Sequence, residues 1–130
     1  MNYLRIKETC LYARDLEAIK RFYHNVLGLP VISHVDDKHI FFRAGESVLL
    51  CFNPDDSRNK KSPPAHFASG KLHFAFEIRE EDYDAEKRRL DAAGVKIIDE
   101  VTWPSGKRSF YFEDPAGNVL EIVPENGIWD

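Results

Sequence analysis

Glu121 occupies an unusual place for a carboxylate near the end of the chain. It lies in residues 119–123, which read VLEIV and predict a β-strand. Side chains alternate between the two faces of a strand, and both faces are otherwise apolar here, so we expect this strand to be covered on both sides. A lone buried carboxylate is costly unless a cation meets it. A metal ion, an arginine such as Arg108 or Arg43, or solvent in an open cavity could stabilise it.

Two further metal-capable side chains emerge from an internal duplication. The predicted order of elements, a strand, a helix and three strands, occurs twice along the chain. When the halves are aligned on their opening strands, Glu8 falls opposite His73. When they are aligned on their closing strands, Glu121 falls opposite Leu49 or Leu50. Three of the four related positions therefore carry groups that can ligate a metal, and the fourth is aliphatic.

The set of Glu8, His73 and Glu121 suits a divalent metal ion. One imidazole and two carboxylates match a borderline or hard cation such as Zn, Ni, Mn, Co or Fe. Three protein ligands leave positions open for water or substrate, as a catalytic site requires. Simpler roles exist for each residue: Glu8 as a solvated carboxylate near a strand start, His73 as a hydrogen-bonded strand residue, and Glu121 as the partner of an arginine.

Five other residues are candidates for catalysis or substrate binding. His66 could act as an acid–base group, since an unperturbed imidazole titrates near neutral pH, although a solvated turn residue is the simpler role. Arg108 and Tyr111 could orient a substrate oxygen. Tyr12 and Cys10 could line the cavity. No cationic neighbour of Cys10 is evident that would lower its thiol pKa, so packing is its simpler role.

The elements that must position these residues follow from the patterns of apolar residues. Strands are predicted over 5–13, 31–35, 38–43, 47–52, 73–78, 95–101, 108–113 and 119–123, and helices over 16–27 and 81–93. Gly28 and Gly94 stand where a glycine commonly ends a helix. Residues 114–117, Asp-Pro-Ala-Gly, form a turn that joins the last two strands into a hairpin.

We divide the chain into two modules and a connecting segment. The first βαβββ module covers residues 1–53 and the second covers residues 72–130. Residues 54–71 are polar, with two adjacent prolines and no clear periodicity. Unstructured loops of this length are uncommon inside compact domains, so we interpret the segment as a linker or an active-site loop.

Composition excludes several classes of function. The 130 residues are 43% hydrophobic and 31% charged, with a formal net charge of −4. This charge and the lack of a Lys/Arg-rich run argue against a nucleic-acid partner. We find no apolar run long enough to span a bilayer and no signal-peptide pattern. The two cysteines, Cys10 and Cys51, suggest no disulfide framework, so we expect a cytoplasmic protein.

Three stretches of the chain together resemble one known superfamily. They read YARDLEAIKRFYHNVLGL, HFAFEI and SFYFEDPAGNVLEIV. The chain resembles the vicinal oxygen chelate superfamily, which includes glyoxalase I, extradiol dioxygenases, fosfomycin-resistance enzymes, methylmalonyl-CoA epimerase and bleomycin-resistance proteins. The resemblance covers nearly all of the chain outside residues 53–71.

The resemblance implies a fold, an assembly and a ligand set. The fold would be of the α+β class, with two tandem βαβββ modules that form a cupped, mostly antiparallel sheet with helices outside, usually in a homodimer. The metal ligands of the superfamily come from the starts of the first and fifth strands and from the last strand. Those positions are Glu8, His73 and Glu121 in this chain.

Some positions depart from individual branches of the superfamily. The first-strand ligand is usually histidine in the dioxygenases and fosfomycin enzymes, whereas this chain has Glu8. The dioxygenase pattern expects a histidine where residues 102–104 read Thr-Trp-Pro. Residues 124–130 lack the basic residues by which fosfomycin enzymes bind a phosphonate, and the aliphatic fourth position departs from glyoxalase I.

Our leading hypothesis is a glyoxalase-like enzyme that depends on a divalent metal. It would perform lyase or isomerase chemistry on a small oxygen-rich substrate through a metal-stabilised enolate or oxyanion, with Glu8, Glu121 or His66 moving the proton. The alternatives are a metal-free ligand-binding protein of the bleomycin-resistance type and an Fe(II) extradiol-type dioxygenase. The sequence leaves open whether each site forms within one chain or between two subunits.

Overall fold

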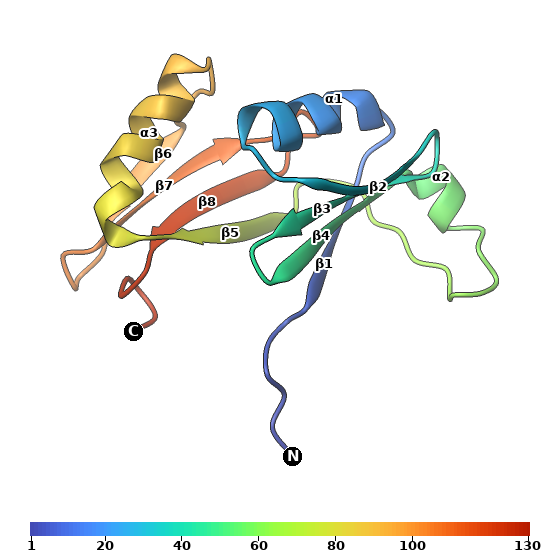
Figure 1. Cartoon of the computed structure of the whole chain (residues 1–130), viewed down its shortest axis with the longest axis horizontal. Coiled ribbons are helices and arrows are strands. Elements are labelled where there is room, and N and C mark those ends of the chain that lie inside the picture. The colour runs from blue at the N-terminus through green and yellow to red at the C-terminus, as the bar shows by residue number, and fades with distance from the viewer. The chain divides into compact units, whose positions relative to one another are not determined.

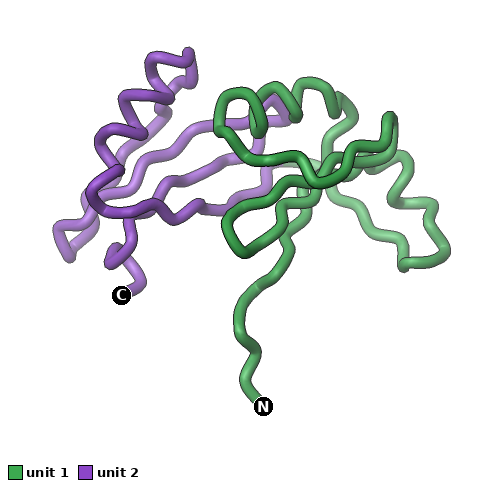
Figure 2. The backbone as a smooth tube through the Cα atoms, in the orientation of Figure 1, with its two compact units in different colours: residues 1–70 green, residues 71–130 purple.

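Each half of the chain folds around its own four-stranded sheet (Figure 1). The structure is a computed structural model that describes residues 1–130. Its contacts divide the chain into two units, residues 1–70 and residues 71–130 (Figure 2). The segment that we predicted as a separate connection, residues 54–71, thus groups with the first unit almost entirely.

The first unit has the strand order β1-β4-β3-β2. Its strands are β1 (Glu8–Tyr12), β2 (Val31–Val35), β3 (His39–Ala44) and β4 (Ser47–Phe52). Its helices are α1 (Leu16–Lys20), which continues as the π-helical η1 (Arg21–Val26), and the short α2 (Pro54–Ser57). Strands β1 and β4 are parallel, and the other neighbouring pairs are antiparallel.

Helix α1 begins and packs as its sequence predicts. The side chain of Asp15 accepts a hydrogen bond from the backbone N–H of Ala18 at 3.0 Å, which caps the helix. Ile19 is buried, and the ring of Tyr23 in η1 lies 5.5 Å from that of Phe42 in β3. The helical stretch is therefore held to one face of the sheet by apolar burial.

The second unit repeats this arrangement with the strand order β5-β8-β7-β6. Its strands are β5 (His73–Ile78), β6 (Asp99–Thr102), β7 (Arg108–Glu113) and β8 (Val119–Pro124), and its helices are η2 (Glu80–Asp82) and α3 (Tyr83–Ala92). The buried core under α3 includes Leu90, Phe110, Phe112 and Leu120. The repeated order of elements and strands confirms the predicted pair of βαβββ modules.

Three elements differ from the sequence-based prediction. The predicted helix over residues 16–27 is α-helical only at its start. The predicted strand over residues 95–101 begins at Asp99, because Val95 instead donates its N–H to the carbonyl of Leu90 at 2.9 Å and closes the helix end. Helix α2 forms because Asn53 caps it and a proline occupies its first position, a signal that we did not use.

The register of the two parallel strand pairs decides one alignment that the sequence left open. In the first unit, Glu8 pairs with Val48 and Cys10 pairs with Leu50. In the second unit, the partner of His73 is Val119, and that of Ala75 is Glu121. Leu50, rather than Leu49, is therefore the counterpart of Glu121.

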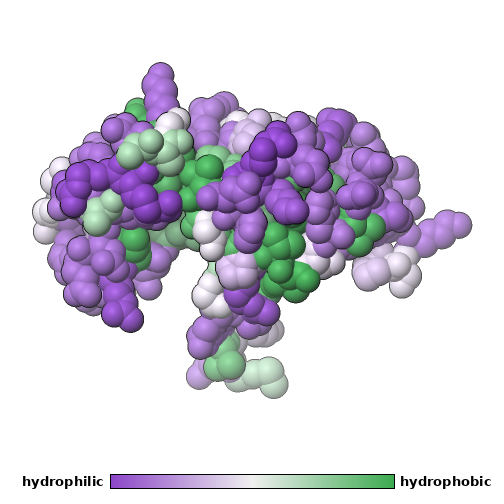
Figure 3. Space-filling view, turned by 45° about the horizontal axis from the view of Figure 1, so that its top comes forward, coloured by the Kyte–Doolittle hydropathy of each residue, from purple (hydrophilic) through white to green (hydrophobic).

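The surface fits a chain with many charged residues. The face drawn in Figure 3 is largely hydrophilic, with smaller hydrophobic areas. Several of the large apolar side chains that are exposed belong to the first six residues, among them Tyr3, Leu4 and Ile6. No helix has both the length and the apolar character that crossing a membrane requires.

Candidate metal centre

His73 and Glu121 come together on one face of the second unit. His73 opens β5 and Glu121 lies in the middle of β8, and the parallel register places both side chains on the face opposite Phe110 and Phe112. The His73 Nε2 atom lies 3.3 Å from the Glu121 Oε1 atom. The side chain of Glu121 is only 7% exposed, whereas that of His73 is 52% exposed. The buried carboxylate predicted from the sequence is thus confirmed.

A backbone carbonyl fixes which nitrogen of His73 faces Glu121. The Nδ1 atom lies 2.8 Å from the carbonyl oxygen of Val119. A carbonyl can only accept a hydrogen bond, so Nδ1 must carry a hydrogen. In the neutral ring, Nε2 then presents a lone pair to the carboxylate. Two acceptors at this separation need a cation between them, either a proton on Nε2 or a metal ion.

The distances favour a metal ion. Ligand atoms about 2.0–2.2 Å from a tetrahedral zinc ion stand about 3.3–3.5 Å apart, which matches the 3.3 Å between Nε2 and Oε1. A charge-assisted N–H···O bond would be shorter, about 2.7–2.9 Å. The second oxygen of Glu121, Oε2, is buried and has no hydrogen-bond partner. The residues present therefore fit a divalent ion. A histidine that binds a metal commonly donates its other ring N–H to a carbonyl, and the carbonyl of Val119 accepts that bond from His73.

The turn before β8 sets the register of the two ligands. The Oδ1 atom of Asp114 accepts hydrogen bonds from the N–H groups of Ala116 and Asn118, each at 2.9 Å. Asn118 returns one from its Nδ2 to Asp114 Oδ2 at 2.9 Å, and its Oδ1 accepts from the N–H of Leu72 at 3.0 Å. Asn118 therefore ties the start of β8 to the residue before His73. Sequence reasoning missed this role, although the Asp-Pro-Ala-Gly-Asn motif carries it.

Tyr111, which we predicted to orient a substrate oxygen, lies on the same face as His73 and Glu121. It pairs directly with Glu121 across β7 and β8, and its ring centre lies 6.1 Å from that of His73. Burial raises the pKa of Tyr111, and the nearby negative charge of Glu121 raises it further, while Ser109 acts in the opposite direction. Tyr111 therefore stays protonated at neutral pH and can donate a hydrogen bond within the site.

Arg108 lies on the other face of β7. Its guanidinium donates to Asp84 Oδ1 at 2.8 Å and lies 4.9 Å from the ring centre of Tyr83. Arg108 and Tyr111 are three residues apart in a strand, which puts their side chains on opposite faces. The structure does not bring Arg108 together with Tyr111 and Glu121, so it does not stabilise that carboxylate.

In the first unit, Glu8, Cys10 and Tyr12 share one face of β1, as predicted. Glu8 is exposed and occupies the place that His73 has in the second unit. Burial, followed by the charge of Glu8, raises the pKa of the Cys10 thiol, which keeps the thiol protonated and argues against a nucleophilic role. Glu8 and the other two ligand candidates belong to different units, so the three-ligand set stays a prediction.

His66 is held against this face by Tyr12. A hydrogen bond of 2.7 Å joins the Tyr12 hydroxyl to His66 Nδ1. The His66 ring also packs edge-on to Phe52, with the ring centres 4.6 Å apart. His66 is therefore positioned rather than freely solvated, and two of the residues that we predicted for the site lie in contact.

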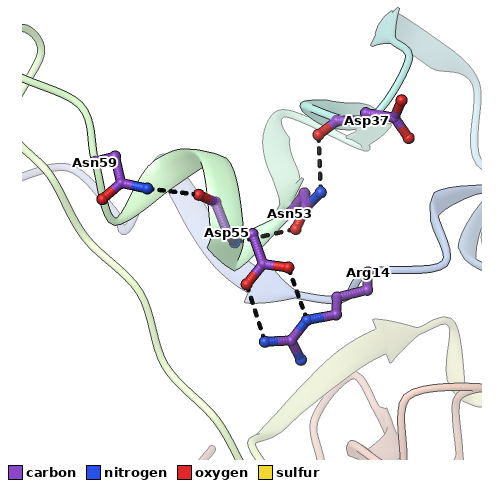
Figure 4. Close-up of polar contacts among 5 residues, drawn as sticks. All are labelled: Arg14, Asp37, Asn53, Asp55 and Asn59. Carbon is purple, nitrogen blue, oxygen red and sulfur yellow. Dashed lines mark hydrogen bonds and ion pairs between the residues drawn. The ribbon is translucent and has the colours of Figure 1, made fainter.

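The segment that carries His66 is anchored where it leaves the sheet (Figure 4). Arg14 donates two hydrogen bonds to the carboxylate of Asp55, at 2.9 and 3.0 Å. The side chain of Asn53 accepts from the N–H of Asp55 at 3.0 Å and donates to the carbonyl of Asp37 at 2.8 Å. Asn59 donates to the carbonyl of Asp55 at 2.9 Å. These bonds hold helix α2 to neighbouring parts of the first unit.

Another group of metal-capable side chains lies on the surface of the first unit. It consists of Glu17, His34 and Asp36, whose ligand atoms lie within 4.8 Å of one another. Both carboxylates face the same nitrogen of His34, at 3.7 and 3.6 Å, and they are 63% and 92% exposed. Exposed acidic groups commonly lie together like this without an ion, and this group shares no residue with the predicted ligand set.

Comparison with known proteins agrees with this architecture. The glutathione transferase FosA of Serratia marcescens is 32% identical over 115 residues, which cover 86% of this chain and 74% of that protein. The metallothiol transferase FosB of Shouchella clausii is 30% identical over 114 residues, which cover 82% of this chain and 69% of that protein.

A solved structure and a family model complete the comparison. The crystal structure of a lactoylglutathione lyase from Agrobacterium tumefaciens is 34% identical, covers 96% of each chain and superposes with a TM-score of 0.91. The model of the Glyoxalase/Bleomycin resistance protein/Dioxygenase superfamily matches residues 5–122. These matches confirm the resemblance stated from the sequence. The chain therefore belongs to the Glyoxalase/Bleomycin resistance protein/Dioxygenase superfamily.

Proposed function

We propose that this protein is a divalent-metal-dependent enzyme of the glyoxalase type. It would perform lyase or isomerase chemistry on a small oxygen-rich substrate. The observation that carries the proposal is the pair formed by His73 and Glu121, in which Nε2 and Oε1 lie 3.3 Å apart and Oε2 has no partner. Glu8, which opens β1 as His73 opens β5, would be the third ligand.

The residues of the chain have distinct roles in this proposal. A divalent ion held by Glu8, His73 and Glu121 would polarise substrate oxygens and stabilise an enolate or related oxyanion. Glu8 is the exposed carboxylate of the set and would take the proton from the substrate carbon. The protonated hydroxyl of Tyr111 would donate a hydrogen bond to a substrate oxygen.

The names of the relatives suggest which substrates to test first. One solved relative is a lactoylglutathione lyase, and two curated relatives are named as a glutathione transferase and a metallothiol transferase. All three names point to thiols or their adducts. Lactoylglutathione and glutathione are therefore the first probes that we would offer to this protein.

Metal analysis of protein purified without chelator tests the proposal. We expect the purified protein to contain up to one equivalent of metal per chain. In calorimetry, at least one of the ions Zn, Ni, Mn, Co and Fe should bind tightly. Substituting His73→Ala or Glu121→Gln should weaken this binding at least tenfold, because each change removes or alters a ligand. The matched control is His34→Ala, which removes the surface group of the first unit and should leave tight binding unchanged.

The activity test follows from the same protein samples. Conversion of lactoylglutathione should disappear in chelator and return when the preferred metal is added back. A purified protein that bound none of the five metals would contradict the proposal. Conversion that survived complete metal removal would contradict it as well.

A metal-free ligand-binding function is a second candidate. The observation in its favour is Leu50, an aliphatic residue at the position in the first unit that corresponds to Glu121 in the second. Of the four positions related by the duplication, only three therefore carry a side chain that can bind a metal. This function predicts that Glu121→Ala binds its ligand as tightly as the wild type does. The metal-dependent function predicts a large loss.

A further inference from the structure

Arg43 shares a row of the first sheet with the predicted metal ligand Glu8. Val48 in β4 pairs with Glu8 in β1 on one side and with Arg43 in β3 on the other. Residues that pair directly across neighbouring strands point to the same face of a sheet, so Arg43 and Glu8 stand on one face. Neighbouring strands lie about 4.8 Å apart, which puts the two residues about 10 Å from each other. A ligand bound near Glu8 therefore needs only a short extension to reach Arg43.

The guanidinium of Arg43 has no partner in the protein. Its backbone is fixed in β3, where its N–H donates to the carbonyl of Pro30 at 2.9 Å. Its side chain is exposed and takes part in no hydrogen bond, ion pair or ring contact. By contrast, Arg5, Arg14 and Arg108 each pair with a carboxylate. Strand β3 therefore presents a permanently charged group that is available to a ligand.

Arg43 also lines a depression in which positive charge is in excess. The depression has a volume of about 570 Å³ and is lined by Leu4, Arg5, Lys7, Arg43 and Glu46. Small-molecule pockets commonly measure about 300–1,000 Å³. Arg5 forms an ion pair with Glu46, whereas Lys7 donates to the backbone carbonyl of Glu46. One carboxylate therefore faces three cations, in a chain whose net charge is −4.

We propose that this depression is an anion subsite in which Arg43 and Lys7 bind the carboxylate of the substrate. The proposal rests on the metal-dependent function proposed above, in which substrate oxygens bind an ion held in part by Glu8. A guanidinium binds a carboxylate through two parallel N–H···O bonds, and an ammonium adds a point charge. The substrate class is therefore a small molecule with metal-binding oxygens at one end and a carboxylate about 10 Å away. The competing explanation is an arginine that faces only water.

A phosphate titration of the metal-free protein tests the anion subsite by itself. Inorganic phosphate should shift the NMR signal of the Arg43 Nε–H group to saturation, and the amide signal of Glu46 reports the affinity in the variants. Arg43→Ala and Lys7→Ala should each weaken phosphate binding about tenfold, as the loss of a hydrogen bond to a charged group does. Arg43→Lys keeps the charge and should lose less. The matched control is Arg21→Ala, which removes an exposed arginine of the first unit outside the depression and should leave binding unchanged.

Two hydroxamates of equal length test the link to the substrate. A hydroxamate binds a divalent ion through two oxygens. Octanohydroxamate ends in a methyl group, whereas suberic acid monohydroxamate ends in a carboxylate. In the zinc-loaded wild type and in Arg21→Ala, the carboxylate should strengthen binding about tenfold, and in Arg43→Ala by less than about twofold. Comparing the ratio of the two affinities between proteins removes any general preference for one probe.

The outcomes separate the anion subsite from the function on which the proposal rests. If phosphate leaves the Arg43 signal unchanged, or binds Arg43→Ala as tightly as the wild type, the subsite is refuted whatever metal the protein binds. If the carboxylate gives the zinc-loaded wild type no advantage, or gives Arg43→Ala the same advantage, the role of the subsite in holding the substrate is refuted. A wild-type protein that bound no metal would overturn the proposed function, and the phosphate titration would still decide whether the anion subsite exists.

Discussion

Replacing Glu121 with leucine should stabilise the metal-free protein while abolishing its response to metal. Glu121 is buried, and its Oε2 atom has no hydrogen-bond partner. The counterpart in the first unit is Leu50, so the substitution copies a solution that the same fold already uses. Most substitutions in a core destabilise. This one should not, because the carboxylate serves a ligand rather than the fold.

The expected size follows from the contacts of Glu121. Removing an ionised carboxylate from water costs several kcal/mol, and well-packed apolar replacements of buried ions have gained about 1–4 kcal/mol. The approach of His73, whose Nε2 lies 3.3 Å from Glu121 Oε1, offsets part of this cost in the wild type. We therefore expect Glu121→Leu to raise the free energy of unfolding by about 1–3 kcal/mol in the absence of metal.

Metal should reverse the order of stability. An ion at 100 times its dissociation constant stabilises the protein that binds it by about 2.7 kcal/mol. The wild type should gain this amount and the variant should gain nothing. Urea unfolding at neutral pH, once with chelator and once with zinc, measures both differences on the same samples.

A matched control and a clear refutation accompany this experiment. Glu113→Leu removes an exposed carboxylate from the same face, where it pairs with Lys71 at 2.8 Å. That change should alter stability by less than about 1 kcal/mol and leave the metal response intact. If Glu121→Leu instead lost more than about 1 kcal/mol in chelator, the carboxylate would be a satisfied structural group and the reasoning would be refuted.

Three further predictions test other contacts. Asn118→Ala should lower the free energy of unfolding by about 2–4 kcal/mol in urea, because it removes a bond to the carboxylate of Asp114 and leaves the partly buried N–H of Leu72, just before β5, unpaired; a loss below about 1 kcal/mol would contradict this. Tyr12→Phe should free His66 and raise the rate of limited proteolysis of its segment about fivefold; an unchanged rate would show that packing alone holds His66. Burial acts to raise the pKa of Glu100, but hydrogen bonds and nearby cations, Lys87 foremost, hold it below the usual value. These contacts stabilise the fold through the ionised form of Glu100. The stabilisation is fully present above the pKa that Glu100 has in the unfolded chain, and it is lost as the pH falls through the lower pKa of the folded state. Lys87→Met should therefore cost about 1 kcal/mol at pH 7, with the gap to the wild type closing below about pH 4.5 in acid unfolding experiments.

The sequence predicted the order of elements and the faces of the strands well. The period of two in residues 119–123 placed Glu121 among apolar neighbours, and the structure confirms a buried carboxylate. The same period could have shown that Arg108 and Tyr111 point to opposite faces, since three residues separate them. Pairing them as substrate-orienting residues overlooked this rule.

The contacts that make a site were beyond the sequence. His73 and Glu121 are 48 positions apart, and their approach depends on the parallel register of β5 and β8. That register depends in turn on Asn118, which binds Leu72 across the two strands. A local pattern contains no information on which strand becomes a neighbour, because the pairing is decided by hydrogen bonds between distant segments.

The sequence by itself determined which residues could ligate a metal and on which face of their strands they stand, because side-chain alternation is a local property of an extended backbone. Tertiary structure alone decided the orientation of those residues. The carbonyl of Val119 selects the free nitrogen of His73, and the strand pairing places Tyr111 beside Glu121. Both depend on atoms that meet only when β5, β7 and β8 lie side by side, and so no pattern along the chain could have revealed them.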